Sequence, residues 1–403
     1  MNTKKFNPFM YVLLRLTFIP YLRLKYNIKS ENKDIFRKIK PPFILIPNHV
    51  GMFDPPMVNI FVPHRVHFVM SDSNLRTPIG KWAYLSLCRV IPKTKAVSDS
   101  ATVRTIIKLV RKKRVICVFA EGRSTWDGVS HDIYFSTSKL LKILKIPVVV
   151  PLIQGGYLSR PRWATSVRRG KLVIRYKQIF SGDDLADLTP DEIHQRLLSE
   201  LWNDDYEFQK RTGIQYKSKK GAEYLERVIF CCPACFKMQT MRSEGNKFFC
   251  QSCGFTSKWT PEGYLHPVNR VGQPTRSMTD WLSWQKTFCD QAIALMDQKK
   301  IDKPIFSDDD VTLKIGYKLN PLKTLMHGKM ELYLDRFQFT SEQNEKKVFP
   351  ISEITGVQVL LANQFEFYHR DAVYKFDFEN PRTSGYKYMC VIQKIAPDKT
   401  ELT

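Results

Sequence analysis

The feature that most constrains the fold is an alternation, over the first 180 residues, of short apolar runs and longer amphipathic stretches. Five runs rich in β-branched residues predict strands, several of them buried on both faces: FILIP (43–47), VHFVM (66–70), VICVF (115–119), VVVPLI (148–153) and KLVIRYK (171–177). Helical periodicity covers 78–87, 98–114 and 131–145, and Ser98 and Asp99 are candidate caps for the second of these helices. Strands that alternate with helices predict an α/β domain with a largely parallel sheet.

The pattern changes after residue 181. Two helical stretches cover 189–204 and 203–227, and a segment rich in cysteine follows. From 308 onward, successive runs of alternating polarity predict antiparallel strands, and YKYMCVIQKI (386–395) follows them. This last region loosely resembles a PH or GRAM-like β domain closed by a helix, with a plain antiparallel sandwich as the alternative.

The charge of the chain is divided unevenly. The whole sequence carries a formal charge of +24, yet residues 1–180 hold 33 Lys+Arg against 8 Asp+Glu, and residues 181–403 hold 30 against 31. A basic field attracts nucleic acid, anionic lipid or an acidic protein, and a solvated basic face is the plainer alternative. We therefore expect an anionic partner for the N-terminal half.

The N-terminal segment NPFMYVLLRLTFIPYLRLKY is apolar but broken by Arg15 and Pro20 and flanked by lysines and arginines. No run of about 18 uninterrupted apolar residues occurs, so we expect this segment to lie in a lipid interface rather than to cross the bilayer. A cleaved signal peptide and a helix packed on the protein's own core are the alternatives.

Two stretches place a histidine five residues before an aspartate. In IPNHVGMFD (46–54), His49 falls on the loop after a predicted strand, where α/β folds put their sites, and Asp54 could turn back toward it. In VHFVMSD (66–72), His67 lies inside a strand, so Asp72 would be displaced by roughly 16 Å along an extended chain. His49 is thus the candidate general base, with Asp54 as a mere helix cap the alternative reading.

A third stretch, VICVFAEGRSTWDG, places Glu121, Gly122 and Arg123 directly after a predicted buried strand. Glycine permits a close backbone approach, and arginine can hold a phosphate in a bidentate manner. Glu121 can accept a substrate hydroxyl or hold the loop. The stretch predicts a phosphate-binding loop.

Taken together, these stretches resemble a known family. NHVGMFD resembles the Asn-His-x4-Asp motif, and FAEGRST the Phe-Pro-Glu-Gly-Thr-Arg-Ser motif, of the glycerolipid acyltransferases typified by lysophosphatidic acid acyltransferase. Their order, their separation of about seventy residues and the strand VVVPLIQGG fit that family over roughly residues 5–210.

The resemblance implies that His49 takes the proton of an acceptor hydroxyl and that Asp54 orients His49. The alkoxide would attack an acyl thioester directly, with backbone amides meeting the oxyanion charge. The substrate-binding residues that it implies are Asn48, Lys93, Lys95, Glu121, Gly122 and Arg123.

Three departures from the family pattern bear on the acceptor. Ala120 replaces the family's proline, and Arg123 stands two residues after the glutamate rather than three. The family's intermediate arginine motif has no arginine here, and Lys93 and Lys95 flank Thr94 instead, which supplies charge without the planar fork.

Four of the nine cysteines form two Cys-x2-Cys pairs separated by fourteen residues: Cys232, Cys235, Cys250 and Cys253. This pattern suits a structural zinc ion and resembles a zinc ribbon, with a redox Cys-x-x-Cys motif as the alternative and Cys231 left over. The segment carries little excess of basic residues, so nucleic acid is not an expected partner.

We therefore predict a peripheral acyltransferase at the cytoplasmic face of the cell membrane, using acyl-CoA or acyl carrier protein and a lysophospholipid, 1-acylglycerol-3-phosphate first. Acceptors such as glycerol-3-phosphate or a glycolipid, or a non-catalytic lipid- or nucleic-acid-binding protein on the same fold, are the alternatives. The predicted organisation is an interface segment (1–30), an acyltransferase domain (31–210), a helical linker (211–228), a zinc ribbon (229–258), a helical connector (259–307) and a β-rich domain (308–403).

Overall fold

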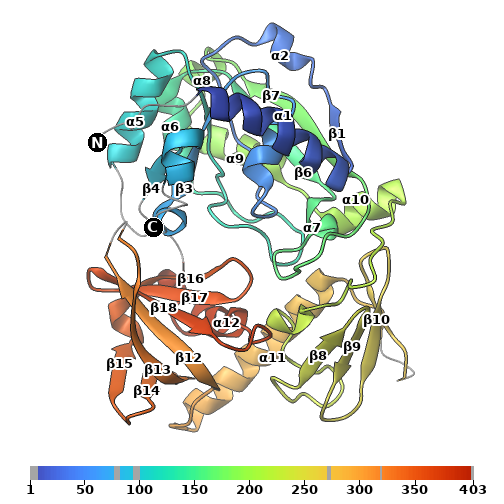
Figure 1. Ribbon diagram of the computed structural model, residues 1–403, viewed down its shortest axis with the longest axis vertical. Coiled ribbons are helices and arrows are strands. Elements are labelled where there is room, and N and C mark those ends of the chain that lie inside the picture. The colour runs from blue at the N-terminus through green and yellow to red at the C-terminus, as the bar shows by residue number, and fades with distance from the viewer. Residues whose placement is uncertain (1–7, 77–81, 94–99, 270–273, 318–319, 401–403) are drawn as a thin grey trace.

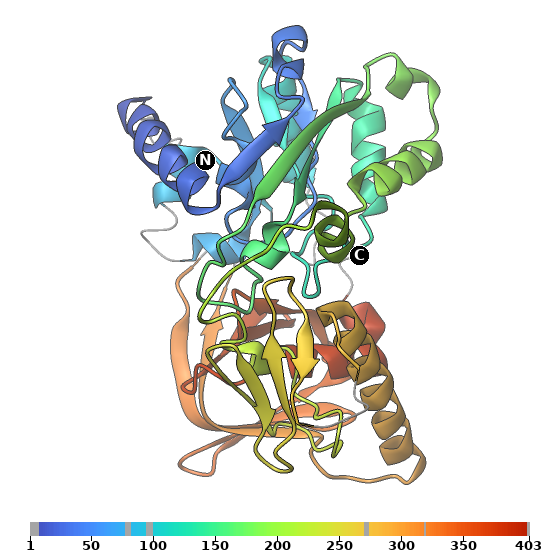
Figure 2. The ribbon, with the colours of Figure 1, turned by 90° about the vertical axis from the view of Figure 1, so that its right-hand side faces the viewer.

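The computed structural model describes residues 8–76, 82–93, 100–269, 274–317 and 320–400. Figure 1 shows an α/β domain above two smaller β units, with the long helix α11 (Met278–Gln298) lying between these two. Figure 2 shows the same division from the side, with the strands of the α/β domain running lengthwise in the view.

The sheet of the α/β domain has seven strands in the order β1-β7-β6-β2-β5-β3-β4. The strands are β1 (Ile28–Glu31), β2 (Ile44–Leu45), β3 (Val66–Ser71), β4 (Ile91–Lys93), β5 (Val115–Cys117), β6 (Val148–Gln154) and β7 (Leu172–Phe180). All neighbours are parallel except β6 and β7. The predicted fold class, an α/β domain with a largely parallel sheet, is confirmed.

Helices cover both faces of this sheet, which explains why its central strands are apolar on both sides. Leu22, Phe36 and Met57, from the helices α1, α2 and α3, pack on one face. Ile106 and Leu141, among others, pack on the opposite face. The helices and helical turns of this domain are α1 (Pro8–Lys25), α2 (Ile35–Lys38), α3 (Asp54–Val58), η1 (Asp72–Leu75), η2 (Ala83–Cys88), α5 (Ser100–Arg111), α6 (Phe135–Leu144), α7 (Gly156–Ser159), α8 (Asp184–Asp187), α9 (Pro190–Leu201) and α10 (Asp205–Thr212).

The predicted helices of this domain are present within narrower bounds. The helix predicted over 98–114 is α5, and its candidate caps Ser98 and Asp99 lie outside the described residues. Of the stretch 78–87, the described part forms η2, a π-helix that ends at Arg89 in a left-handed conformation. Thr189 caps α9 in a reciprocal capping box with Glu192, as the sequence of its first turn favours.

The predictions of a helix over 203–227 and of a helical linker over 211–228 are wrong for most of these ranges, because the chain between residues 213 and 224 is not helical. Helix α10 ends at Gly213, whose φ of 66° closes the last turn by a bond from its N–H to Gln209. The chain then runs against the α/β domain, where Lys217 pairs with Arg169, and only η3 (Leu225–Arg227) is helical. Tertiary packing overrides the helical periodicity here.

The cysteine-rich unit is a four-stranded antiparallel sheet in the order β11-β10-β9-β8. Its strands are β8 (Met241–Glu244), β9 (Lys247–Cys250), β10 (Thr256–Trp259) and β11 (Leu265–Pro267). The sheet therefore continues past 258, so the connector predicted as helical over 259–307 begins with a strand and becomes helical only at α11. Gln285 of α11 joins the two parts, because its side chain accepts from the amides of Phe230 and Cys231.

The β domain has seven antiparallel strands in the order β15-β14-β13-β12-β18-β17-β16. Its elements are β12 (Phe306–Gly316), β13 (Lys323–Leu332), β14 (Arg336–Ser341), β15 (Lys346–Pro350), η4 (Ile351–Glu353), β16 (Ile354–Leu360), β17 (Gln364–His369), β18 (Ala372–Phe378), α12 (Tyr386–Ile395) and η5 (Pro397–Lys399). Tyr388 of α12 is fully buried and packs on Phe337 and Phe365. The antiparallel β unit and its closing helix are thus present.

A buried polar contact fixes the β domain to the α/β domain. Arg76, just after η1, donates to the carboxylate of Glu366 at 2.9 Å and to the hydroxyl of Tyr368 at 2.8 Å, both on β17. Asp72 completes the group, 3.6 Å from the Arg76 guanidinium. Breaking a buried ion pair costs several kcal/mol, roughly 3–5, so this contact holds the two domains in one arrangement.

The N-terminal helix α1 packs on its own domain and also exposes apolar side chains. Leu22 is buried, and Phe18 and Ile19 contact the core beside it. The exposed apolar side chains of α1 are Phe9, Val12, Leu13, Leu16, Tyr21 and Leu24. Among the described residues, no helix combines the length and apolarity needed to cross a membrane.

Candidate active site

The loop after β2 brings His49 and Asp54 together. His49 Nδ1 lies 2.7 Å from Asp54 Oδ2, and the same oxygen accepts the amides of Val50 at 2.7 Å and Gly51 at 2.9 Å. A carboxylate oxygen only accepts, so Nδ1 carries the hydrogen of the imidazole and Nε2 is left with its lone pair. Asp54 is the first residue of α3 and nearly fully buried, whereas the His49 side chain keeps 23% of its surface exposed.

The side chain of Asn48 ties this loop to strand β6. Its amide nitrogen donates to the carbonyl of Ile153 at 2.9 Å, and its amide oxygen accepts the Ile153 N–H at 2.7 Å. The side chain is buried and both of its ends are occupied by strand β6. These bonds favour a role for Asn48 in positioning the loop over the substrate-binding role that the resemblance implies.

Glu121 joins the loop after β5 to the loop after β2. Its Oε1 accepts the amide of His49 at 2.8 Å, and its Oε2 accepts the amide of His131 at 2.9 Å. Burial raises the pKa of Glu121 to about 8, although these two amide bonds and the charge of Arg123 oppose the shift. Of the two roles considered for Glu121, the structure favours holding the loops over accepting a substrate hydroxyl, because both carboxyl oxygens are occupied.

Gly122 is required by a close approach that the sequence did not specify. Its φ is 66°, and a Cβ atom on it would clash with the ring of Tyr134. Lys93, the last residue of β4, also approaches Tyr134, with its ammonium 5.5 Å from the centre of the ring. Lys95 lies outside the described residues.

Arg123 is half-buried beside this pair of loops. No hydrogen bond or ion pair holds its guanidinium within the part of the chain that the structure describes. An arginine in a site without a carboxylate partner is available to an anionic ligand.

His67 and Asp72 do not form a second dyad. His67 is buried in β3, where its Nδ1 lies 3.2 Å from the carbonyl oxygen of Arg89, and burial lowers its pKa. Asp72 instead faces Arg76 and Tyr368 at the domain contact. The extended strand separates the two side chains, as the spacing argument required.

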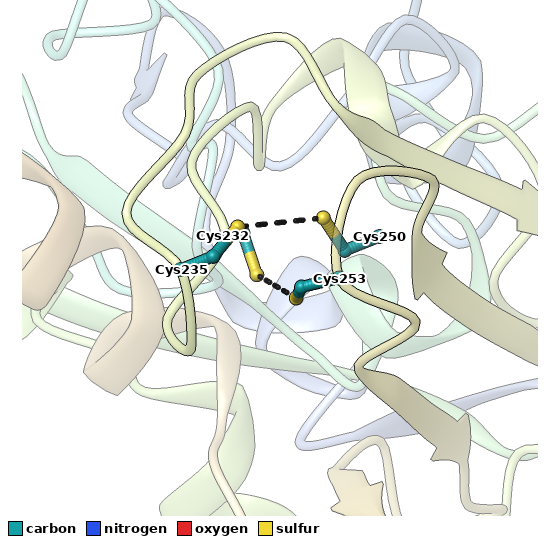
Figure 3. Close-up of side chains that lie close together, drawn as sticks. All are labelled: Cys232, Cys235, Cys250 and Cys253. Carbon is teal, nitrogen blue, oxygen red and sulfur yellow. Dashed lines mark hydrogen bonds between the residues drawn. The ribbon is translucent and has the colours of Figure 1, made fainter.

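The four predicted metal ligands converge. The Sγ atoms of Cys232, Cys235, Cys250 and Cys253 all lie within 4.8 Å of one another, and Figure 3 shows them pointing into one space between the two knuckles. The distance is 3.6 Å between Cys232 and Cys253 and 3.8 Å between Cys235 and Cys250. Four thiolates bound at about 2.3 Å to a tetrahedral zinc ion would be about 3.8 Å apart, so the set fits that metal. Cys231 is not part of the set and lies 3.9 Å from Cys289.

Two basic residues near the site were missed by sequence reasoning. His131 follows the Glu121 loop, and Arg162 follows helix α7. Neither belongs to a recognisable motif. The available signal was their position, since each comes within about ten residues of a loop or strand end at the same edge of the sheet.

A His–Asp dyad beside a basic loop, at the carboxyl edge of parallel strands, defines a site built for general-base transfer chemistry. Comparison with known families agrees: residues 27–153 match the family described as Acyltransferase.

Two solved structures show distant likeness. The crystal structure of the 1-acyl-sn-glycerophosphate (LPA) acyltransferase PlsC from Thermotoga maritima is 17% identical, covering 47% of this chain and 82% of that chain with a TM-score of 0.37. The Vps36 N-terminal PH domain is 14% identical, covering 25% of this chain and 85% of that chain with a TM-score of 0.21.

Proposed function

We propose that this protein transfers a fatty acyl group from an acyl thioester to the hydroxyl of a lysophospholipid, with 1-acylglycerol-3-phosphate as the acceptor. The observation that carries the proposal is the contact of 2.7 Å between His49 Nδ1 and Asp54 Oδ2, within a domain of the acyltransferase family. The acidic headgroup is supported by Arg123, which has no carboxylate partner among the described residues.

The reaction needs no acyl-enzyme. His49 Nε2 takes the proton of the acceptor hydroxyl while Asp54 stabilises the imidazolium that forms. The oxygen attacks the thioester carbon, the C–O bond forms and the C–S bond breaks. The imidazolium returns its proton to the leaving thiolate, so the enzyme ends in its starting state.

We propose further that the protein works as a peripheral protein on the cytoplasmic face of the cell membrane. Helix α1 exposes Phe9, Leu16 and Leu24 on the same domain that carries the site. The N-terminal half is also strongly basic, so apolar insertion and attraction to anionic lipid would act together.

The acyl donor would be acyl-CoA or an acyl carrier protein. Both present an acidic surface or phosphate groups to the basic half of the chain. The cysteine unit would hold a structural zinc ion through its four thiolates, which would stabilise the knuckles that pack on α11.

The test is an acyl-transfer assay with the purified full chain on vesicles that contain a lysophospholipid and a labelled acyl thioester. We expect His49→Ala to lose transfer by a factor of about 1,000 or more. His266→Ala is the matched control, because His266 is exposed on β11 and its imidazole hydrogen-bonds to the hydroxyl of Thr275. Equal transfer by His49→Ala and wild type would end the catalytic assignment.

A further inference from the structure

Three basic side chains gather beside the catalytic loop without a matching acid. They are Arg123, His131 and Arg162, and none forms an ion pair with a carboxylate within the described ranges. Glu121 lies in the same loop region, and its two oxygens already accept backbone amides. Arginine charge in a buried setting without a counter-charge is costly unless a ligand supplies one.

Arg162 is held in this cluster by neutral groups. Its guanidinium donates to the carbonyl of Ser124 at 3.0 Å and to the carbonyl of Val359 at 2.7 Å, and it stacks on Trp126 with 3.7 Å to the ring centre. Its Nε is buried and has no acceptor within the part of the chain that the structure describes. Burial and the charge of Arg123 lower the pKa of Arg162 to about 9, so the side chain is still cationic at neutral pH.

These contacts place the cluster at the junction of two domains. Ser124 belongs to the loop after β5, whereas Val359 belongs to β16 of the β domain. The β domain therefore helps to hold the guanidinium of Arg162, through the carbonyl of Val359, and so takes part in building the site.

His131 lies close to His49 and carries a ring nitrogen that can bind a ligand. Glu121 holds its backbone amide with one carboxyl oxygen and that of His49 with the other, so the two histidines are attached to one carboxyl group. The Nε2 atom of His131 is buried and has no hydrogen-bond partner among the described residues. Burial and the charges of Arg123 and Arg162 lower the pKa of His131 to about 4, so the imidazole is neutral at pH 7.

We infer that His131 and Arg162 join Arg123 to form the site for the phosphate group of the acceptor, next to His49. Arg123 would bind phosphate oxygens directly, His131 would donate one hydrogen bond, and Arg162 would supply charge from behind the Ser124 loop. The inference rests on the proposed function, which it deepens by naming how the acidic headgroup is held. It also accounts for a phosphate site in a chain that lacks the intermediate arginine motif.

The first experiment compares two acceptors. We expect His131→Ala to lower kcat/KM for 1-acylglycerol-3-phosphate by about tenfold or more, since one hydrogen bond to a charged group is lost. The slower transfer to a neutral monoacylglycerol should stay unchanged, and His131→Gln, which keeps a donor, should recover part of the loss. His266→Ala serves again as the control. An unchanged preference for the phosphorylated acceptor in His131→Ala would overturn the inference, and so would a change in the KM of the thioester donor alone.

The second experiment needs no turnover. Calorimetric titration of the full chain with sn-glycerol 3-phosphate should give an affinity about tenfold weaker in His131→Ala than in wild type. If wild type binds the phosphate in this way but transfers no acyl group, the proposed function fails and the phosphate site stands. If wild type transfers acyl groups but both proteins bind the phosphate equally, the phosphate site fails and the proposed function stands. Should His131→Ala not fold, His131→Leu, which fills the space without a donor, replaces it in both experiments, and wild-type behaviour of that variant counts against the inference.

Discussion

The replacement of Asp54 by asparagine separates the charge of the dyad from its geometry. All three donors around Asp54, which are His49 Nδ1 and the amides of Val50 and Gly51, converge on Oδ2. An asparagine that places its carbonyl oxygen at that point still accepts from all three, so the loop and the tautomer of His49 should persist. Only the negative charge that stabilises the imidazolium is lost.

The magnitude follows from the difference between charged and neutral hydrogen bonds. That difference is about 1–1.5 kcal/mol, so we expect kcat of Asp54→Asn to fall by about tenfold. Asp54→Ala removes the acceptor altogether and leaves the amides of Val50 and Gly51 without a partner, at about 1–3 kcal/mol each. We expect this variant to lose about 1,000-fold in kcat and about 2–4 kcal/mol in the free energy of unfolding.

The assay is single-turnover acyl transfer on vesicles, measured together with denaturant unfolding of the same preparations. Asp187→Asn is the control, because Asp187 is exposed on α8. A folded Asp54→Asn as inactive as Asp54→Ala would show that Asp54 does more than stabilise charge. Full activity in Asp54→Asn would remove Asp54 from the chemistry.

Three further predictions concern the surrounding structure. Gly122→Ala should lower the free energy of unfolding by about 2–4 kcal/mol, because its new Cβ meets Tyr134. The control Gly213→Ala has the same φ of 66° and nothing within 4 Å, so it should lower that free energy by only about 1 kcal/mol. Equal losses in denaturant titrations would refute the steric argument. Folding raises the pKa of Glu121 to about 8, so the favourable contribution of its neutral carboxyl group to the free energy of unfolding is full below about pH 4.5 and is lost as the pH rises through 8. Wild type should therefore lose stability relative to Glu121→Gln between pH 5 and 8. Parallel curves of stability against pH for the two proteins would contradict this. Protein purified without chelator should contain about one zinc ion per chain and Cys235→Ser much less by metal analysis, and equal low contents would count against the metal site.

The sequence by itself was sufficient for the α/β core and for the dyad. The apolar runs are strands because both faces of the sheet are covered, and that burial is written into their composition. His49 and Asp54 are five residues apart on one loop, so local geometry alone could bring them together. The spacing of the cysteines likewise predicted the convergence of four thiolates.

Local periodicity failed where long-range packing competes with it. The stretch after Gly213 has helical spacing, yet it lies against the α/β domain, where the backbones of Lys217 and Arg169 form an antiparallel β-bridge. The resemblance implied substrate contacts for Asn48, and the sequence left open whether Glu121 meets a substrate or holds its loop. Their distant partners, 105 and 72 residues away, favour the loop-holding role for both.

The basic cluster at the domain junction was decided by tertiary structure alone. His131 approaches His49 through a shared carboxyl group, and Arg162 is held by a carbonyl of the β domain, 197 residues further along the chain. Neither contact follows from periodicity or motif spacing, because each depends on how separate units fold against one another. The sequence thus determined which chemistry the site can perform, and the packing of the domains determined which charges surround it.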